Sequence, residues 1–221
     1  MIQKSTLDFL KTLGKNNNKD WFDKNKDKYL AAKQNIDDMA DELIKSFTTF
    51  DKKLAGLKAK DCVFRIYRDI RFSKNKTPYK TNMGCAISPG GRKAEEAGYY
   101  IHIEPGKSFL AGGRWMPSPD HLKKIRQEID YNGKNLHKIL SEKNFKKQFG
   151  ELDSSEEYKL ARPPKGYDKN HPDIELLKLN SYIVWCDYSD KDVLSKNFLK
   201  EITKGAKIMK PFLDFLNEAV S

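Results

Sequence analysis

Residues 98–104 read Gly98-Tyr99-Tyr100-Ile101-His102-Ile103-Glu104, and apolar and polar side chains alternate from Tyr99 onward. Successive side chains of a β-strand point to opposite faces, so this period of two predicts a strand with one buried face. The opposite face of that strand carries Tyr100, His102 and Glu104.

Further strands are expected around this one. Residues 64–72 show the same alternation, with Phe64, Ile66, Ile70 and Phe72 between polar residues. Shorter strand-like segments occur at residues 83–88 and 108–112, and residues 181–188 (SYIVWCDY) are expected to return to the sheet as a buried strand. Sequential strands joined by short loops favour an antiparallel sheet.

Helical spacing of apolar residues predicts helices toward both ends of the chain. The expected ranges are 5–14, 20–50 as one long helix broken at most once, 118–129, 136–149, 173–179 and 194–215, the last interrupted near Gly205 or Pro211. Ser118-Pro119 is typical of a helix start, with an N-cap followed by proline at the first helical position. Prolines and charges in residues 149–173 predict a long surface excursion.

We therefore expect an α+β fold in a single domain over residues 1–221. A central, mainly antiparallel sheet, formed by about residues 62–113 plus 181–188, should pack against N- and C-terminal helices.

Composition restricts the class of protein further. The 221 residues contain 42 Lys and Arg against 31 Asp and Glu, a formal net charge of +11. No stretch of about 18 apolar residues could span a bilayer, and the N-terminal residues lack a signal core, so we expect a cytoplasmic protein without a membrane partner. The three cysteines form no CxxC pair, which argues against a disulfide framework and against a cysteine-rich zinc site.

The charge is concentrated in one segment. Residues 65–80 carry net +5, and Asp69 is their only acid. The cations are Arg65, Arg68, Arg71, Lys74, Lys76 and Lys80. A lysine-rich background predicts little, whereas a local excess of this size favours an anionic ligand.

Two interpretations of this segment stay open. In a structural one, Arg68 projects to the apolar face and pairs with a carboxylate such as Glu104, while Arg65 and Arg71 flank Asp69. In a functional one, a bulge at Arg68-Asp69 turns several cations toward one pocket. The following loop, residues 73–82, adds Ser, Thr and Asn donors of the kind that hold phosphate oxygens, although it could equally be an exposed turn.

Tyr100, His102 and Glu104 form a second polar constellation on one strand face. A His and a carboxylate two residues apart can serve as general acid and base, so His102, Glu104 and the nearby Tyr79 are candidates for proton transfer. A hydrogen-bonded sheet face is the competing interpretation. The other histidines lack metal-ligand spacing, and we expect neither a metal site nor a cofactor.

The pair Gly112-Gly113, followed by Arg114 and Trp115, lacks the pattern of a phosphate-binding loop. These glycines are expected to permit a bulge or a close backbone approach. We expect Trp115 in the core, although Arg114 and Trp115 could also line a pocket.

Four motifs in order give the chain a resemblance to a known family. They are Asn18-Lys19-Asp20-Trp21-Phe22, residues 65–80, residues 98–105 and residues 109–117. Together they resemble the signature of DUF2461, a family of uncharacterised bacterial and fungal proteins. Ala111 stands where a third glycine is expected. The resemblance implies a single domain of this size, and it implies no established activity, cofactor or catalytic residue.

Two hypotheses of different class follow. In the first, a binding or catalytic pocket holds a small phosphorylated or carboxylated anion through Arg65, Arg68, Arg71, Lys76 and Lys80, with Asp69 orienting an arginine. In the second, residues 65–80 and neighbouring tyrosines form a nucleic-acid-binding module. A concave site with converging arginines would favour the first hypothesis, and an extended basic stripe the second. The oligomeric state and the question of enzymatic activity stay open.

Overall fold

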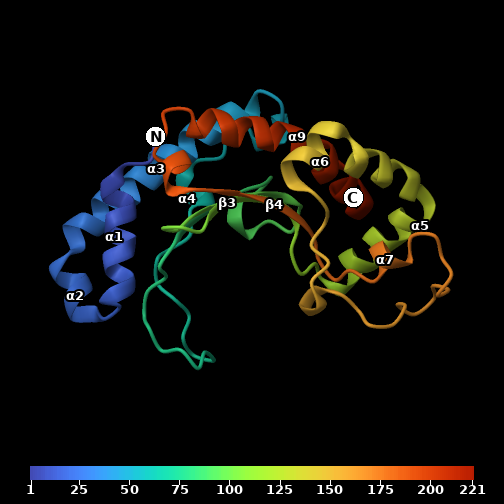
Figure 1. The fold of residues 1–221 in the computed structure, drawn as a ribbon, viewed down its shortest axis with the longest axis horizontal. Helices are drawn as coiled ribbons and strands as arrows, with labels where there is room; N and C mark the ends of the chain where they lie inside the picture. Colours follow the sequence, from blue (N-terminus) through green and yellow to red (C-terminus); the bar gives the residue numbers. More distant parts are fainter. The chain divides into compact units, whose positions relative to one another are not determined.

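The computed structural model describes all residues 1–221, and it has nine α-helices and one four-stranded antiparallel sheet (Figure 1). The strands are β1 (Met83–Ile87), β2 (Gly98–Ile103), β3 (Ser108–Arg114) and β4 (Tyr182–Tyr188), in the order β1-β2-β3-β4. The helices are α1 (Lys4–Lys15), α2 (Lys19–Lys24), α3 (Lys26–Thr48), α4 (Ala59–Cys62), α5 (Pro119–Ser141), α6 (Lys143–Phe149), α7 (Ile174–Leu177), α8 (Asp190–Val193) and α9 (Phe198–Val220). The predicted α+β fold is confirmed.

The chain divides into two compact units. The first comprises residues 1–94, 100–110 and 187–204, and the second comprises residues 95–99, 111–186 and 205–221. Both β2 and β3 contribute residues to each unit. The single domain over residues 1–221 stays a prediction.

In the first unit, α1 packs against α3 through an apolar face. The predicted helix over residues 20–50 exists with one break, at Asn25, which separates α2 from α3. Asn25 leaves the helical conformation, and its side-chain amide donates to the carbonyl of Trp21 at 2.9 Å. Asn18 caps α2 by accepting from the Trp21 N–H at 2.9 Å. These side-chain bonds satisfy backbone groups that a helix end leaves unpaired.

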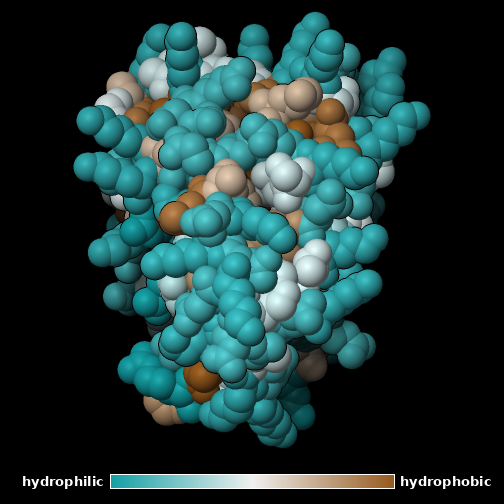
Figure 2. All heavy atoms as spheres, turned by 90° about the vertical axis from the view of Figure 1, so that its left-hand side faces the viewer, coloured by the Kyte–Doolittle hydropathy of each residue, from teal (hydrophilic) through white to brown (hydrophobic).

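The charged residues of these N-terminal helices belong to a solvent-exposed surface. Figure 2 views the molecule from the side on which α1 and α2 lie in Figure 1, and that face is mostly hydrophilic with scattered apolar side chains. The interspersed charges of residues 1–60 are therefore those of a hydrated helical surface.

The predicted strand over residues 64–72 is wrong. Residues 64–80 instead form an irregular hairpin, visible in Figure 1 as the loop that leaves the sheet ahead of β1. A single isolated bridge, Tyr67 to Tyr79, joins its two arms, with backbone bonds from Arg68 N to the Pro78 carbonyl (2.9 Å) and from Lys80 N to the Ile66 carbonyl (2.8 Å). Pro78 has no N–H to donate, so the ladder cannot continue through it.

The base of this hairpin is fixed by contacts with the α1–α2 connection. The Asn17 side chain donates to the Tyr79 carbonyl at 2.9 Å and accepts from the Tyr79 N–H at 3.0 Å, as a neighbouring strand would. The Tyr79 ring stacks on Phe22 with centroids 4.0 Å apart. A segment without a regular ladder is thus held in place from one end.

The alternation of β2 is as predicted. Tyr99, Ile101 and Ile103 are at most 2% exposed, whereas Tyr100, His102 and Glu104 project from the opposite face and are partly exposed.

In the second unit, α5 begins where predicted, at Pro119, and the Ser118 hydroxyl accepts from the His121 N–H at 3.4 Å. The helix continues to Ser141, past a non-helical residue at Asn132, and is therefore longer than predicted. Residues 150–173 form the expected excursion, with only one short 3-10 turn at Glu156–Tyr158.

The predicted interruption of the C-terminal helix is wrong, because α9 runs through Pro211 without a break. Proline inside a helix removes one backbone hydrogen bond. The buried side chains that follow it offset this loss, and they are Phe212, Leu213, Phe215 and Leu216. None of the helices combines the length and the apolar character that a membrane span requires.

The glycine pair before Arg114 permits close backbone approaches, as predicted. A Cβ on Gly112 would lie 2.0 Å from the sulfur of Met209, and a Cβ on Gly113 would lie 2.0 Å from the carbonyl oxygen of Tyr182. Gly113 also has φ of 127°, a conformation that other residues rarely adopt.

We expect Gly113→Ala to destabilise the protein by more than Gly56→Ala. Both glycines have positive φ, which costs roughly 1–3 kcal/mol for another residue, but a Cβ on Gly56 meets nothing within 4 Å. The free energies of unfolding in urea, measured by circular dichroism, test this. Equal losses in the two variants would show that the backbone conformation alone requires glycine at residue 113.

Candidate functional site

The hairpin separates the predicted cationic residues into two groups. Arg68, Asp69, Arg71 and Lys76 lie toward its tip, and Arg65 and Lys80 lie at its base beside β2. The predicted bulge that would direct all these cations into one pocket is not formed, because residues 64–72 belong to no strand.

Asp69 and Arg71 form a bidentate ion pair. The Arg71 Nε donates to Oδ1 at 3.0 Å, and Nη2 donates to Oδ2 at 2.6 Å. The side-chain hydrogen bond from Arg71, a backbone hydrogen bond from the same residue and the charge of Arg65 lower the pKa of Asp69, while burial opposes them weakly. Both interpretations of the segment allow this pair, and it compensates the charge of Asp69, so the role of Asp69 in orienting an arginine toward a ligand stays a prediction.

Arg68 is not paired with Glu104. Its Nη1 donates to the carbonyl and the hydroxyl of Thr77 at 3.0 and 2.5 Å, and its Nη2 donates to the Ser73 hydroxyl at 3.3 Å. All three acceptors are neutral oxygens of the hairpin. Arg68 therefore cross-links the tip and keeps its charge uncompensated.

The rest of the tip is organised in the same way. The Lys76 ammonium donates to the Ile70 carbonyl at 3.0 Å. The Asn75 side chain accepts from the N–H and the hydroxyl of Thr77, both at 2.9 Å, which makes a local Asx turn. Lys74 is exposed and makes no hydrogen bond or ion pair.

At the hairpin base, the Lys80 ammonium lies 5.3 Å from the centroid of the Phe64 ring. Burial and the neighbouring charge of Arg65 lower the pKa of Lys80. Phe64 in turn meets the Tyr100 ring edge-on, with centroids 6.2 Å apart. Lys80 is therefore linked through Phe64 to the polar face of β2, and Arg65 acts on Lys80 through its charge.

The polar face of β2 carries a continuous hydrogen-bonded chain. The Tyr100 hydroxyl is 3.1 Å from His102 Nδ1, His102 Nε2 is 3.1 Å from Glu104 Oε2, and the Thr81 hydroxyl donates to Glu104 Oε1 at 2.7 Å. The His102 ring also stacks on Phe109, with centroids 4.6 Å apart and an interplanar angle of 8°.

Tyr100 keeps its proton at neutral pH. Burial, with smaller contributions from Cys85 and Glu104, raises the pKa of Tyr100 to about 12. A protonated phenol can donate to a ring nitrogen or accept from it, so either tautomer of His102 completes the chain. Both ring nitrogens are occupied, so in this state His102 is a link in a structural chain that a ligand would have to open before proton transfer.

Tyr79 lies apart from that chain. Its side chain is 4% exposed and packs on Phe22 and Tyr67, and no hydrogen bond or ring contact joins it to His102 or Glu104. Its role as a proton-transfer candidate stays a prediction that no contact supports.

Sequence reasoning missed several participants. Thr81 and Phe109 complete the surroundings of His102 and Glu104, and Phe72 is 95% exposed at the hairpin tip. The sequence places Tyr100 on the same strand face as His102, and the structure shows that its hydroxyl is a hydrogen-bond partner of His102. No grouping of three or more His, Cys, Asp and Glu side chains that could hold a metal ion is present.

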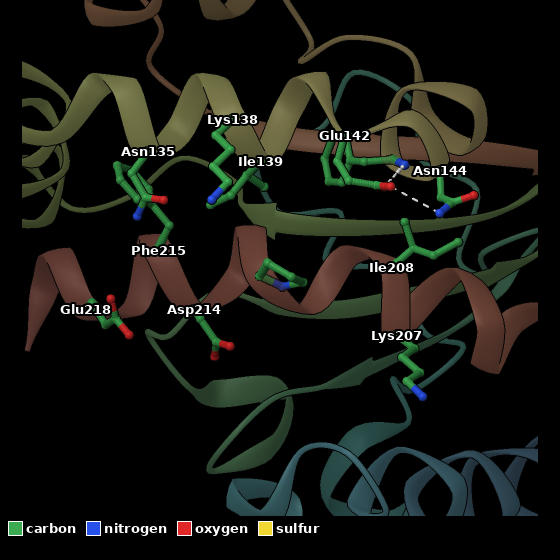
Figure 3. A pocket seen from close by; sticks show the side chains of 12 residues that line it. Asn135, Lys138, Ile139, Glu142, Asn144, Lys207, Ile208, Asp214, Phe215 and Glu218 are labelled. Carbon is green, nitrogen blue, oxygen red and sulfur yellow. Dashed lines mark hydrogen bonds between the residues drawn. The ribbon is translucent and has the colours of Figure 1, made fainter.

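A groove of about 610 Å³ lies in the second unit, between α5–α6 and the second half of α9 (Figure 3). Its charged lining is mixed, with Lys138 and Lys207 together with Glu142, Asp214 and Glu218. Glu142 is engaged at the start of α6, where it accepts from the Phe145 N–H at 2.8 Å. None of the predicted site residues lines this groove.

We expect Tyr100→Phe to make the protein's stability less sensitive to alkaline pH. A raised pKa in the folded state means that stability is complete below pH 10 and is lost as the pH rises toward 12. Between pH 9 and pH 11 this loss amounts to about 1 kcal/mol for one such group. Urea unfolding at both pH values measures it, with Tyr131→Phe, whose side chain is 80% exposed, as the control. An identical loss in the Tyr100→Phe variant would contradict the argument.

Comparison with known proteins identifies the family of this chain, but it assigns no activity. No curated protein and no solved structure matches the chain. The family described as "Conserved hypothetical protein (DUF2461)" matches residues 5–215, which is nearly the whole chain. The chain therefore belongs to the DUF2461 family, as its four sequence motifs indicated.

Proposed function

We propose that this protein binds single-stranded nucleic acid through the basic hairpin, residues 64–80. One observation carries the proposal: five of the hairpin's six cations have no carboxylate partner. They are Arg65, Arg68, Lys74, Lys76 and Lys80. The only acid of the segment, Asp69, is already paired with Arg71.

An uncompensated cluster of this kind attracts a polyanion. Like charges close together in one short segment repel each other, and a chain of phosphates relieves that repulsion while releasing its own counterions. Arg68 and Lys76 hold neutral oxygens of the hairpin, so they contribute charge and keep the tip in shape at the same time. The nucleic acid would not have to order the tip on binding, which lowers the entropic cost.

The aromatic residues of the hairpin suit unpaired bases. Phe72 is 95% exposed and Tyr67 is 48% exposed. Burying such rings against protein would be the usual outcome for apolar side chains, whereas exposed rings among cations are typical of platforms on which bases stack. Duplex DNA offers no free base face, so the proposal is restricted to single strands.

The alternative, a pocket for a small anion, has less support at the tip. The arginines there do not converge, since Arg71 pairs with Asp69 and Arg68 turns to Thr77 and Ser73. At the base, the partly buried Lys80 contacts Phe64, which meets Tyr100 of the hydrogen-bonded chain, and the charge of Arg65 lies close enough to Lys80 to lower its pKa; this keeps small-anion binding as a second candidate function. Candidate proton-transfer residues there are His102 and Glu104.

Binding of a fluorescein-labelled 20-nucleotide oligouridine, followed by anisotropy at 50 to 200 mM salt, tests the proposal. The affinity should fall steeply with salt, because each neutralised phosphate of a single strand contributes about 0.7 to the logarithmic slope. The double variant Lys74→Gln/Lys76→Gln should lower the slope by about 1.4. Phe72→Ala should weaken binding about 5- to 150-fold without changing the slope, since one stacked base is worth about 1–3 kcal/mol.

The matched control is Lys4→Gln/Lys11→Gln, which removes the same charge from exposed positions of α1. Equal weakening by both double variants would show diffuse electrostatic attraction and would overturn the proposal. Saturable binding of inorganic phosphate that depends on Arg65 and Lys80, without oligonucleotide binding, would favour the second candidate. Binding of anionic phospholipid vesicles alone would point to a membrane surface instead.

A further inference from the structure

Arg114, the last residue of β3, has no partner in the second unit. Its guanidinium makes no hydrogen bond and no ion pair, and its Nε is closed to solvent. The two Nη atoms also lack a partner, but they are not among the closed-off atoms. Burial lowers the pKa of Arg114, and the charges of Glu95 and Glu96 oppose that shift only in part. A guanidinium nitrogen that is closed to solvent and has no hydrogen-bond partner is costly, and native proteins seldom keep one without a use.

His121, in the first turn of α5, adds a second unsatisfied nitrogen. Its Nδ1 is closed to solvent and has no hydrogen-bond partner. Its Nε2 lies 3.7 Å from a carboxylate oxygen of Glu95, too far for a hydrogen bond. Glu95 influences both Arg114 and His121 and is 68% exposed, so its side chain can turn away into solvent.

The segment between these residues is strained and presents apolar surface. Met116 is the only residue other than glycine with positive φ, at 46°, and its N–H donates to the buried Ser181 hydroxyl at 2.9 Å. Trp115 is 63% exposed and Met116 is 55% exposed, so the prediction that Trp115 belongs to the core is wrong. Strain of this kind costs about 1–3 kcal/mol and concentrates at functional sites.

We propose that Arg114, Trp115, Met116 and His121 form a binding site for a small ligand that joins an anionic group to an aromatic ring. The Nη atoms of Arg114 offer two parallel donors that fit a carboxylate or a phosphate. Trp115 and Met116 follow Arg114 directly in the chain, and their exposed indole and thioether offer an apolar surface for the ring. Glu95, whose charge acts on Arg114 and whose carboxylate lies 3.7 Å from His121 Nε2, competes with the anion of the ligand.

We assign an anionic group to the ligand because the site lacks a hydrogen-bond acceptor for Arg114. Arg114 offers only donors, so an acceptor has to satisfy it. Inorganic phosphate alone would leave Trp115 and Met116 uncovered, and a neutral aromatic compound would leave Arg114 unsatisfied. The site therefore distinguishes its ligand from either fragment. It shares no residue with the basic hairpin, so each proposal can fail without the other.

The test uses the full chain labelled with 5-fluorotryptophan, whose three signals are assigned by Trp→Phe variants. Phenyl phosphate and benzoate are the probes, with inorganic phosphate and benzyl alcohol as the fragments. We expect one or both probes to shift the Trp115 signal at millimolar concentration and to bind at least tenfold more tightly than either fragment. The signals of Trp21 and Trp185 report any effect elsewhere.

Two substitutions should act in opposite directions. Arg114→Gln should weaken probe binding at least tenfold, whereas Glu95→Gln should strengthen it threefold or more by removing the competing carboxylate. Arg162→Gln, which removes the same charge from an exposed position of the second unit, is the control and should have no effect. Should Arg114→Gln fail to fold, the Glu95→Gln variant still decides the matter.

A stability measurement separates binding from a structural role. An unpartnered guanidinium that serves a ligand predicts that Arg114→Met unfolds at the same temperature as the parent or at a higher one. The proposal is overturned if neither probe moves the Trp115 signal at 10 mM, or if Arg114→Gln and Arg162→Gln bind the probes equally. A lower unfolding temperature of Arg114→Met, together with absent binding, would assign Arg114 to packing.

Discussion

The alternation of β2 is the constraint on which the first unit depends. Because successive side chains of a strand point to opposite faces, burial of Tyr99, Ile101 and Ile103 obliges the residues between them to face away from the core. Tyr100 and His102 then meet the ring of Phe109, and Tyr100 also meets the ring of Phe64 at the start of the hairpin. A register shift of one residue would put an imidazole and a carboxylate into the core, so packing and the hydrogen-bonded chain fix each other.

The hairpin that precedes β1 is held together by side-chain hydrogen bonds and not by a buried apolar face. It has almost no apolar core of its own, and hydrogen bonds made by the side chains of Arg68, Lys76 and Asn75 replace the regular ladder that its alternating sequence predicts. Its anchor is remote in the sequence, since Asn17 and the ring of Phe22 hold Tyr79 at the base. A segment built in this way can carry five uncompensated cations and an exposed phenylalanine, which a buried strand could not do.

In the second unit, the unusual residues lie in the segment that begins at Gly113. The close approach of its backbone to Tyr182 requires glycine, and the chain then turns through the strained Met116 into the capped start of α5. This path leaves Arg114 partly buried and without a partner, and it turns Trp115 toward solvent. The features that defy the usual placement of residues therefore occur together, which is the arrangement that a ligand site would explain.

The sequence by itself determined those features that depend on residues close together in the chain, namely the strands, the helix starts and the local charge. Period-two alternation predicted β2, strand-like runs predicted β1, β3 and β4, and Ser118-Pro119 predicted the start of α5. The same alternation wrongly predicted a strand over residues 64–72. Only the tertiary structure decided which partner each polar side chain takes. Thr81 rather than Arg68 bonds to Glu104, Arg68 turns to Thr77, and Asn17 reaches Tyr79 across 62 positions. Alternation and capping act within a few residues and can be read from local sequence, whereas hydrogen-bond partners and exposure depend on which distant segments the fold brings together.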